Sequence, residues 1–526
     1  MELMRHASVP GLRLPVQAIV AGLAGTMALF VLSVAVAKLG ALPALAGAGA
    51  LLIVFALCLL PRASAFVAVV LLYSNVVVMF AGTPLYQVVG ASSAILLALP
   101  VADQLLIRGQ SPRLDRVFGL MVMFLIVLLL SAFAAEDIRL AIKEIVQYAT
   151  EGMLIYVLVI NVIRSPRDLQ RVMAACVLSC AVLSAMTIFQ AATHQYQYQF
   201  GGLAQRIDAI QEIQRRTRLL AIQEEPDEQP LEIAPPDEEG VALIDRASGP
   251  IGDPNRFAQL LLVVLPWSLY FSRHGRTPLA RVASAASSAL ILTAVALTYS
   301  RGAFITMAVL VVCLLLWRYI RPGRLAVAAL VLAGIVAVMA PGVFSRIASI
   351  GGVGVLGQQD AKVEPDGAIR GRATEMLAAL AVFIDHPFLG VGPGQYVPFY
   401  SERYQMLDEV SFRHLPRPRE AHNLYFSIGA ELGAAGLVVF LLIVATLFAG
   451  LRAARRFWLP RSRRRTDLAV AFALSLVSYL GTGMFLHLSF ERYLWFLVGT
   501  ASAAIYVLRQ EQLRQSVEEA HALGRE

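Results

Sequence analysis

The chain has 526 residues, of which 58% are hydrophobic and only 15% are charged, and its formal net charge is +8. Its mean hydropathy is +0.68. A water-soluble domain could not bury so much apolar surface, so these values exclude an ordinary soluble globular protein. They predict an all-α polytopic membrane protein.

About fourteen runs are long enough, at roughly 20 apolar residues each, to cross a bilayer as helices. Their length and the absence of strand-like alternation favour helices over barrel strands. The predicted spans are Val16–Ala37, Ala41–Leu60, Ala65–Ala81, Val88–Ile107, Val117–Ala134, Ile145–Ile163, Val172–Phe189, Asn255–Phe271, Leu279–Tyr299, Ala303–Trp317, Leu325–Ala340, Leu424–Gly450, Leu468–Leu486 and Tyr493–Leu508.

Every second connection between these spans is rich in arginine, from Arg62 to the cluster at 461–465. Short loops rich in arginine or lysine stay on the cytoplasmic side, so both termini are predicted to be cytoplasmic. The same loops account for most of the net charge. A nucleic-acid partner is therefore not expected.

This topology divides the chain into six regions. They are an N-terminal transmembrane bundle (1–190), an extracytoplasmic loop (191–254), a central group of transmembrane helices (255–340), a large extracytoplasmic loop (341–422), the C-terminal transmembrane helices (423–508) and a cytoplasmic tail (509–526). Long loops of this kind tend to be functional or disordered. In the first loop, the amphipathic stretch Gln205–Gln223 and the acidic, proline-rich run Glu224–Gly240 predict an accessory insertion whose second part is disordered.

The four cysteines, Cys58, Cys176, Cys180 and Cys313, all fall within predicted spans. None lies in the outer loops, where an oxidising compartment could pair them. We therefore expect no disulfide and no zinc site. No cofactor is expected for this chain either.

Two arginines stand at the outer starts of predicted helices. Asp253 suits a helix N-cap and Pro254 the first helical position, but capping does not explain Arg256. Arg301, in Ser300-Arg301-Gly302, is forced to the outer membrane boundary, where free backbone N–H groups favour an anion. A phosphate shared between Arg301 and the helix end would explain this placement. The alternative is an interfacial arginine that reaches lipid headgroups.

The second long loop adds two further arginines. Arg370 and Arg372 open a predicted amphipathic helix that extends through Phe383 and leads into the glycine-rich segment 386–394. Guanidinium groups bind phosphate through paired donors, and glycine lets backbone approach a ligand closely. The alternative is that the glycines merely form turns.

His422 and Asn423 precede a long span in which Gly429, Gly433 and Gly436 have helical spacing. That spacing predicts close helix packing, and it places His422 at the outer mouth of the bundle with a side chain suited to proton transfer. Glu431 is expected roughly 13 Å below His422, inside the membrane, where it needs a partner or a role. The alternative for His422 is a structural interfacial histidine.

His422-Asn423, followed after nine residues by Gly433 and after two more by Gly436, resembles the histidine motif of bacterial O-antigen ligases and Wzy-type polysaccharide polymerases. The segments around Asp253, Ser300-Arg301-Gly302-Ala303 and Arg372, with Pro387–Gly392, resemble further segments of that family in the same order. The resemblance covers about Ile251–Gly436. Two features depart from the family: Met376, where an aromatic residue is frequent, and the Gln205–Gly240 insertion.

The resemblance implies an enzyme of GT-C-like architecture on the periplasmic face of the bacterial inner membrane. It would be a metal-independent inverting glycosyltransferase that moves a glycan from an undecaprenyl-pyrophosphate-linked donor to a hydroxyl of an acceptor sugar. Arg301 and Arg372 would hold the donor pyrophosphate, with Arg256 as an extra contact. His422 would be the catalytic residue, and Arg370, Asn423 and Glu431 secondary site residues. Membrane lipids and a chain-length regulator would be further partners.

Three functions fit these observations. A repeat-unit polymerase for an exopolysaccharide is favoured by the large outer insertion. A ligase that attaches the chain to lipid A core would use the same residues. A lipid-linked oligosaccharide flippase or transporter would place charges along a central cavity and show internal repeats, whereas here no repeat is evident.

Overall fold

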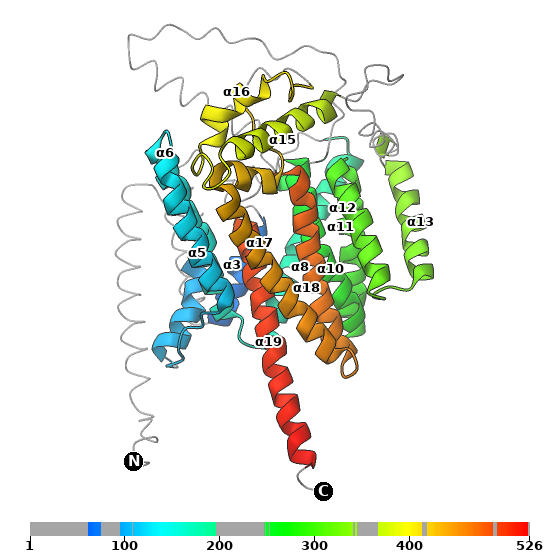
Figure 1. The fold of residues 1–526 in the computed structure, drawn as a ribbon. Coiled ribbons are helices and arrows are strands. Elements are labelled where there is room, and N and C mark those ends of the chain that lie inside the picture. The colour runs from blue at the N-terminus through cyan, green and yellow to red at the C-terminus, as the bar shows by residue number, and fades with distance from the viewer. Residues whose placement is uncertain are drawn as a thin grey trace, which may run out of the picture.

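The computed structural model describes residues 61–74, 95–107, 109–195, 247, 249–251, 253–339, 342–343, 367–412, 418–487 and 492–523. These residues form helices and no strands (Figure 1). The predicted spans Val16–Ala37 and Ala41–Leu60, the insertion Gln205–Gly240 and Cys58 lie outside them.

The helices are α3 (Pro61–Ser74), η2 (Asp103–Ile107), α5 (Arg116–Ser131), η3 (Ala132–Ala134), α6 (Ile138–Gln147), η4 (Tyr148–Leu154), α7 (Ile155–Val162), α8 (Pro166–Ala192), η6 (Gly249–Ile251), α10 (Pro254–His274), α11 (Pro278–Leu297), α12 (Arg301–Leu316), α13 (Pro322–Met339), α15 (Gly367–Asp385), η8 (Tyr396–Tyr400), α16 (Ser401–Gln405), α17 (Leu424–Trp458), α18 (Arg463–Thr482), η9 (Gly483–Phe485) and α19 (Arg492–Leu523).

Within the described residues, six helices are long and apolar enough to cross a membrane. They are Arg116–Ala134, Ile138–Val162, Pro166–Ala192, Pro278–Leu297, Leu424–Trp458 and Arg463–Phe485. Shorter apolar helices include Arg301–Leu316 and Leu325–Ala337. The prediction of a polytopic all-α membrane protein is therefore confirmed. The number of fourteen spans and their orientation stay predictions.

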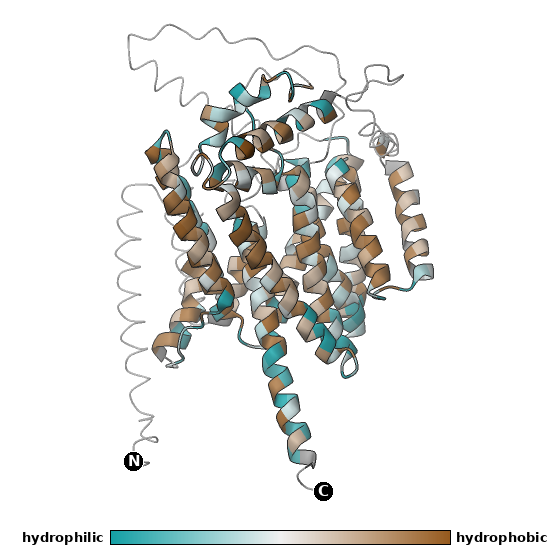
Figure 2. Cartoon of the chain, in the orientation of Figure 1, coloured by the Kyte–Doolittle hydropathy of each residue, from teal (hydrophilic) through white to brown (hydrophobic). Residues whose placement is uncertain are grey.

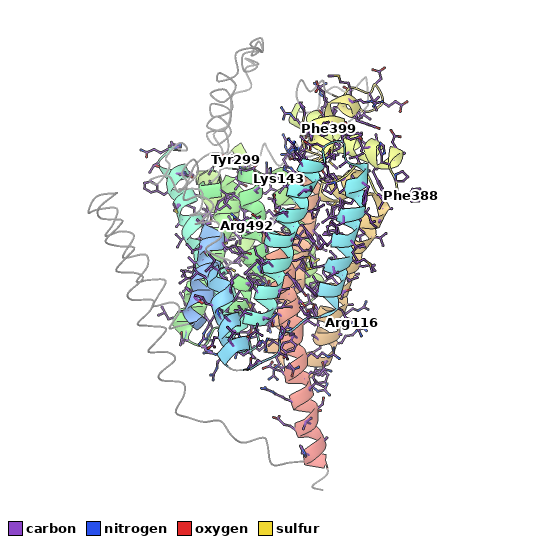
Figure 3. The ribbon with its side chains drawn as sticks, turned by 90° about the vertical axis from the view of Figure 1, so that its left-hand side faces the viewer. Arg116, Lys143, Tyr299, Phe388, Phe399 and Arg492 are labelled. Atoms are coloured by element: carbon purple, nitrogen blue, oxygen red, sulfur yellow. The ribbon has the colours of Figure 1, made fainter. Side chains whose placement is uncertain are left out.

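The hydropathy of the helices separates two polar ends from an apolar middle. Figure 2 shows apolar residues along the bundle and polar residues in α15, in α16 and where α17 meets α18. Figure 3 places Tyr299, Phe388 and Phe399 towards one end of the bundle and Arg116 towards the other. We call the end formed by α15 and α16 the α15 end.

The arginine-rich connections gather at the opposite end of the bundle. Asp467, at the start of α18, lies within 3.4 Å of side-chain nitrogens of Arg273, His274 and Arg463. The guanidinium of Arg463 also donates to the backbone oxygen of Arg318. Connections that are far apart in the sequence therefore meet at one end, which we call the arginine end. This is the arrangement that their common basic character predicts.

Helices α10 and α18 are central and connect these two ends. Trp267 of α10 is fully buried against Phe472 of α18, with ring centroids 5.3 Å apart. Nearer the α15 end, the Gln259 amide donates to the hydroxyl of Thr482 at 2.8 Å. Any group at the start of α10 is therefore positioned by the end of α18.

The structure corrects one sequence expectation about α17. Gly433 was expected to pack within a regular helix, but its φ of 63° and ψ of −163° interrupt the helix at this point. Gly429 does allow close packing, because a Cβ atom at this position would lie 3.1 Å from the ring of Phe383 in α15.

The break in α17 is stabilised by the glycine-rich segment 387–392. The amides of Val391 and Gly392 donate to the backbone oxygens of Ala430 and Glu431, at 2.9 and 3.0 Å. In return, the amides of Ala434 and Ala435 donate to Pro387 and Phe388. The segment therefore replaces hydrogen bonds that the interrupted helix cannot make. We call these hydrogen bonds between residues 387–392 and 430–435 the clamp on α17. The backbone of Gly390 and Gly392 thus lies close to α17, while the approach of these glycines to a ligand stays a prediction.

Candidate functional site

The starts of three helices converge on residues 483–487, which we call the 483–487 segment. A Cβ atom on Gly302, in the first turn of α12, would lie 2.8 Å from the ring of Phe485. The amide of Asn423, at the start of α17, donates to the backbone oxygen of Met484 at 3.1 Å. Arg256, in the first turn of α10, contacts His487. Three positive helix ends thus face one region at the α15 end.

Each of these helices begins at a side-chain N-cap, and the cap predicted at Asp253 is confirmed. The side chains of Asp253, Ser300 and Asn423 are the N-caps of α10, α12 and α17, and each accepts a bond from a backbone amide of its helix. Directly before two of these caps, Tyr299 and His422 have φ values of 53° and 44°. This left-handed conformation costs about 1 kcal/mol or more for a residue other than glycine. Strain of this kind is concentrated at functional sites, which supports a role for His422.

A buried carboxylate orients the imidazole of His422. Its Nδ1 atom lies 3.0 Å from Oε2 of Glu375 in α15 and 3.1 Å from the backbone oxygen of Glu420. Both partners are hydrogen-bond acceptors, so Nδ1 carries a proton and donates. The lone pair of the neutral ring is therefore on Nε2. Within the described residues Nε2 makes no hydrogen bond, so it is available to accept a proton from a hydroxyl.

Glu375 is 3% exposed. The Nη1 atom of Arg419 lies 3.9 Å from its Oε1 atom. A buried carboxylate is costly unless it is paired, and both the imidazole and the guanidinium reduce that cost. Glu375 therefore acts on any reaction through His422, as a positioning residue.

A second histidine, His487, connects His422 to Arg256. The two imidazole rings are 5.5 Å apart and nearly perpendicular. Nη2 of Arg256 lies 2.9 Å from Nε2 of His487. Because a guanidinium can only donate, Nε2 of His487 is the acceptor and its ring is neutral. Burial lowers the pKa of His487 well below 6.5, and the positive charge of Arg256 and the presence of His422 lower that pKa further.

This shift predicts a pH-dependent stability. The unfolded chain binds a proton at His487 near the ordinary pKa of 6.5, while the folded protein does not, so stability falls as the pH drops below about 6.5. We expect His487→Asn, which keeps an acceptor for Arg256, to lose less stability than the wild type between pH 7.5 and 5.5. The difference should be on the order of 1 kcal/mol in thermal unfolding of the purified protein. The exposed His521 of α19 supplies the control His521→Asn. An equal loss for wild type and His487→Asn would contradict the assignment.

The predicted phosphate-binding arginines lie on the elements that surround this histidine pair. Arg372 is one helical turn before Glu375 on α15, so the two side chains share a face of that helix. Arg301 is the first residue of α12 and precedes the glycine that packs on Phe485. Both side chains are half-buried. Arg370 lies two residues before Arg372, and its Nε atom is buried without a hydrogen-bond partner in the part of the chain described.

Asn423 and Glu431 have clear structural roles. The side chain of Asn423 caps α17 through the amides of Tyr425 and Phe426, at 3.0 Å each. Glu431 is buried, and the backbone N–H groups of Gly394 and Tyr396 face its carboxylate. The buried carboxylate of Glu431 is thus paired with the backbone of the segment that follows the clamp on α17. Asn423 positions His422, while Glu431 supports the loop.

Sequence reasoning missed Glu375, Glu420 and His487. A signal existed for His487, because it follows the predicted span Leu468–Leu486 on the side where His422 was expected. For Glu375 the only signal was its spacing of three residues from Arg372. Among the described residues no group of three or more side chains could hold a metal ion. Cys176 and Cys180 of α8 and Cys313 of α12 are free thiols there.

Comparison with known proteins finds one family model that matches part of the chain. A family model described as O-antigen ligase matches residues 286–441, which include Arg301, Arg372, Glu375 and His422. Arg256 and His487 lie outside the matched segment. No curated protein matches the chain. The match covers less than a third of the chain, and it contains α12, α15 and the start of α17 but neither α10 nor the 483–487 segment. Residues 286–441 thus resemble the O-antigen ligase family, which confirms the resemblance inferred from the sequence.

Proposed function

We propose that the protein is a glycosyltransferase of the inner membrane that acts on its periplasmic side. It transfers a glycan from an undecaprenyl-pyrophosphate-linked donor to a hydroxyl of an acceptor sugar. The observation that carries this proposal is the pair formed by Glu375 and His422. The pair leaves Nε2 of His422 without a hydrogen bond to the described residues, on a ring 5.5 Å from that of His487, which contacts Arg256.

The chemistry follows from these groups. As the acceptor hydroxyl attacks the anomeric carbon of the donor sugar, its proton passes to Nε2 of His422. The bond from that carbon to the pyrophosphate breaks, and negative charge grows on the leaving group. Fixed guanidinium groups and helix starts stabilise this charge without a metal ion. Attack opposite the leaving group inverts the anomeric configuration.

We favour a polymerase that joins lipid-linked repeat units of an exopolysaccharide. The second candidate is a ligase that attaches a finished chain to lipid A core, which the O-antigen ligase description of the matched family favours. Deletion of the gene distinguishes them. Accumulation of single-repeat undecaprenyl pyrophosphate glycans supports the polymerase, whereas long chains retained on undecaprenyl pyrophosphate support the ligase. Normal surface polysaccharide in the deletion strain would contradict both.

The positioning role of Glu375 gives a prediction about rate. Glu375→Gln keeps the size of the side chain, but its amide can also donate to Nδ1 and so place the proton of the imidazole on Nε2. We expect kcat for glycan transfer to fall by about 10–10²-fold. The KM for the lipid-linked donor should change little, because Glu375 does not bind it. The matched control is Glu402→Gln, since Glu402 is exposed on α16.

Arg301 and Arg372, unlike Glu375, should act directly on the lipid-linked donor. We expect Arg301→Gln and Arg372→Gln each to lower kcat/KM for the lipid-linked donor by about 10²-fold, because each removes stabilisation of the charge that develops on the pyrophosphate. Arg403→Gln, on the exposed face of α16, is the control. The donor can be extracted from the deletion strain. An unchanged kcat/KM in both variants would show that the pyrophosphate binds elsewhere.

A further inference from the structure

Two adjoining cavities lie at the arginine end, opposite the candidate site. The larger has a volume of about 790 Å³ and is lined by residues of α8, α10, α18 and α19. The smaller has a volume of about 400 Å³ and lies among α8, α10 and α11. They share five lining residues: Arg167, Gln170, Arg171, Arg276 and Arg464. The two cavities therefore form one continuous space.

The larger cavity is strongly basic. Five arginines line it against two carboxylates, those of Asp168 and Glu511. Asp168 pairs with Arg171 at 3.4 Å, and Glu511 pairs with Arg465 at 2.7 Å. In the described residues no carboxylate lies within 4 Å of the guanidinium groups of Arg167 or Arg276. Arg167 and Arg276, both exposed, therefore carry positive charge with which no carboxylate of the described residues forms an ion pair.

The smaller cavity is mainly apolar. Its wall is formed by Val177 and Leu178 of α8, Phe271 of α10, and Ala280 and Ala283 of α11. Leu178 is 53% exposed. Because α8 and α11 are both long and apolar enough to span a membrane, an apolar wall between them suits contact with lipid chains. The small side chains of α11 leave room for an aliphatic chain beside α8.

The space is remote from the candidate site. Helix α10 has 21 residues, so its rise separates the ends by roughly 30 Å. Arg256 is in the first turn of α10, at the α15 end. Arg276 lies two residues after His274, the last residue of the helix, at the arginine end. A molecule bound between Arg167 and Arg276 is therefore not the glycan donor of the α15 end.

We propose that this space binds an anionic glycerophospholipid. Its headgroup phosphate lies between Arg167 and Arg276 in the basic cavity, where guanidinium groups form paired bonds to phosphate oxygens. One acyl chain lies in the apolar cavity against α8 and α11. Basic pockets between transmembrane helices bind anionic headgroups in this way. Only an amphiphile uses both parts of the space, which favours a lipid over a soluble phosphate.

Native mass spectrometry of the delipidated, full-length protein tests the proposal. The probes are phosphatidylglycerol and phosphatidylcholine with identical acyl chains, and sn-glycerol 3-phosphate. We expect wild type to bind phosphatidylglycerol more tightly than phosphatidylcholine. Arg167→Gln/Arg276→Gln should weaken phosphatidylglycerol binding by about 30-fold, since each basic residue near an anionic headgroup accounts for roughly a fivefold change. The control Arg452→Gln/Arg456→Gln removes two exposed arginines of α17 that do not line the cavities.

A second variant tests the apolar part. Ala283→Phe places a ring in the smaller cavity from an exposed position, so it should weaken phosphatidylglycerol binding while the protein stays folded. Equal binding of the two lipids, or an equal loss in the cavity and control double variants, would overturn the proposal. So would tight binding of sn-glycerol 3-phosphate that Ala283→Phe does not alter, because the site would then take a soluble anion.

Discussion

We expect His422→Asn to reduce the rate of glycan transfer by about 10²–10⁴-fold, the usual contribution of a general base. Asparagine tolerates the left-handed backbone that residue 422 adopts, with its φ of 44°, so the variant should fold. Its amide cannot accept a proton at neutral pH. The fall should appear in kcat when transfer from extracted lipid-linked donor is followed with purified protein.

The design of this variant separates chemistry from folding. Alanine at residue 422 would combine loss of the base with backbone strain, whereas asparagine removes the base alone. His521→Asn, in the exposed part of α19, controls for loss of a histidine elsewhere. If the rate of His422→Asn stayed within about threefold of wild type, the contribution of His422 would be too small for general-base catalysis. The proposed role of His422 would then be wrong.

We expect Gly433→Ala to destabilise the folded protein. The backbone of Gly433, with φ 63° and ψ −163°, lies in a region that only glycine populates readily. A Cβ atom there would lie 2.3 Å from the backbone carbon and oxygen of Phe388, which cannot move without breaking the clamp on α17. Strain and overpacking each cost about 1–3 kcal/mol. We expect a lower yield of folded protein and a melting temperature lower by several degrees.

Two further variants make this result specific. Gly390→Ala should have a similar effect, because its Cβ atom would lie 2.3 Å from the backbone of Glu431 on the other side of the same contact. Gly119→Ala in α5 is the control, since nothing lies within 4 Å of the added atom. Alanine there should leave stability unchanged or raise it slightly. A melting temperature of Gly433→Ala within about 2 °C of wild type would contradict the clamp.

Local chemistry made part of the structure predictable. Asp253 could be recognised as a cap because a short polar side chain before proline and an apolar run is typical of a helix start. The start of α15 near Arg370 followed from its amphipathic pattern. The arginine connections were expected on one side because insertion into a membrane sorts basic loops. Each of these inferences depends on residues that are close in sequence.

The remaining features depend on contacts between distant segments. Glu375 and His422 meet only because α15 lies across the start of α17, and the sequence does not encode that crossing in a local pattern. Gly433 showed the same spacing as a packing glycine, since the backbone bonds that permit a break come from residues 387–392. His487 stood just beyond a predicted span, where an isolated histidine carries little information.

The 483–487 segment has a consequence for biosynthesis. Membrane proteins are made from the N-terminus onward, so His422 and the arginines at 256, 301 and 372 leave the ribosome before residues 483–487. Until α18 is in place, the starts of α10, α12 and α17 lack the surface on which they converge. The nascent chain therefore carries every arginine of the site without its geometry. If the protein has the proposed activity, that activity therefore depends on insertion of α18 and the residues that follow it, and a partly synthesised chain is inactive.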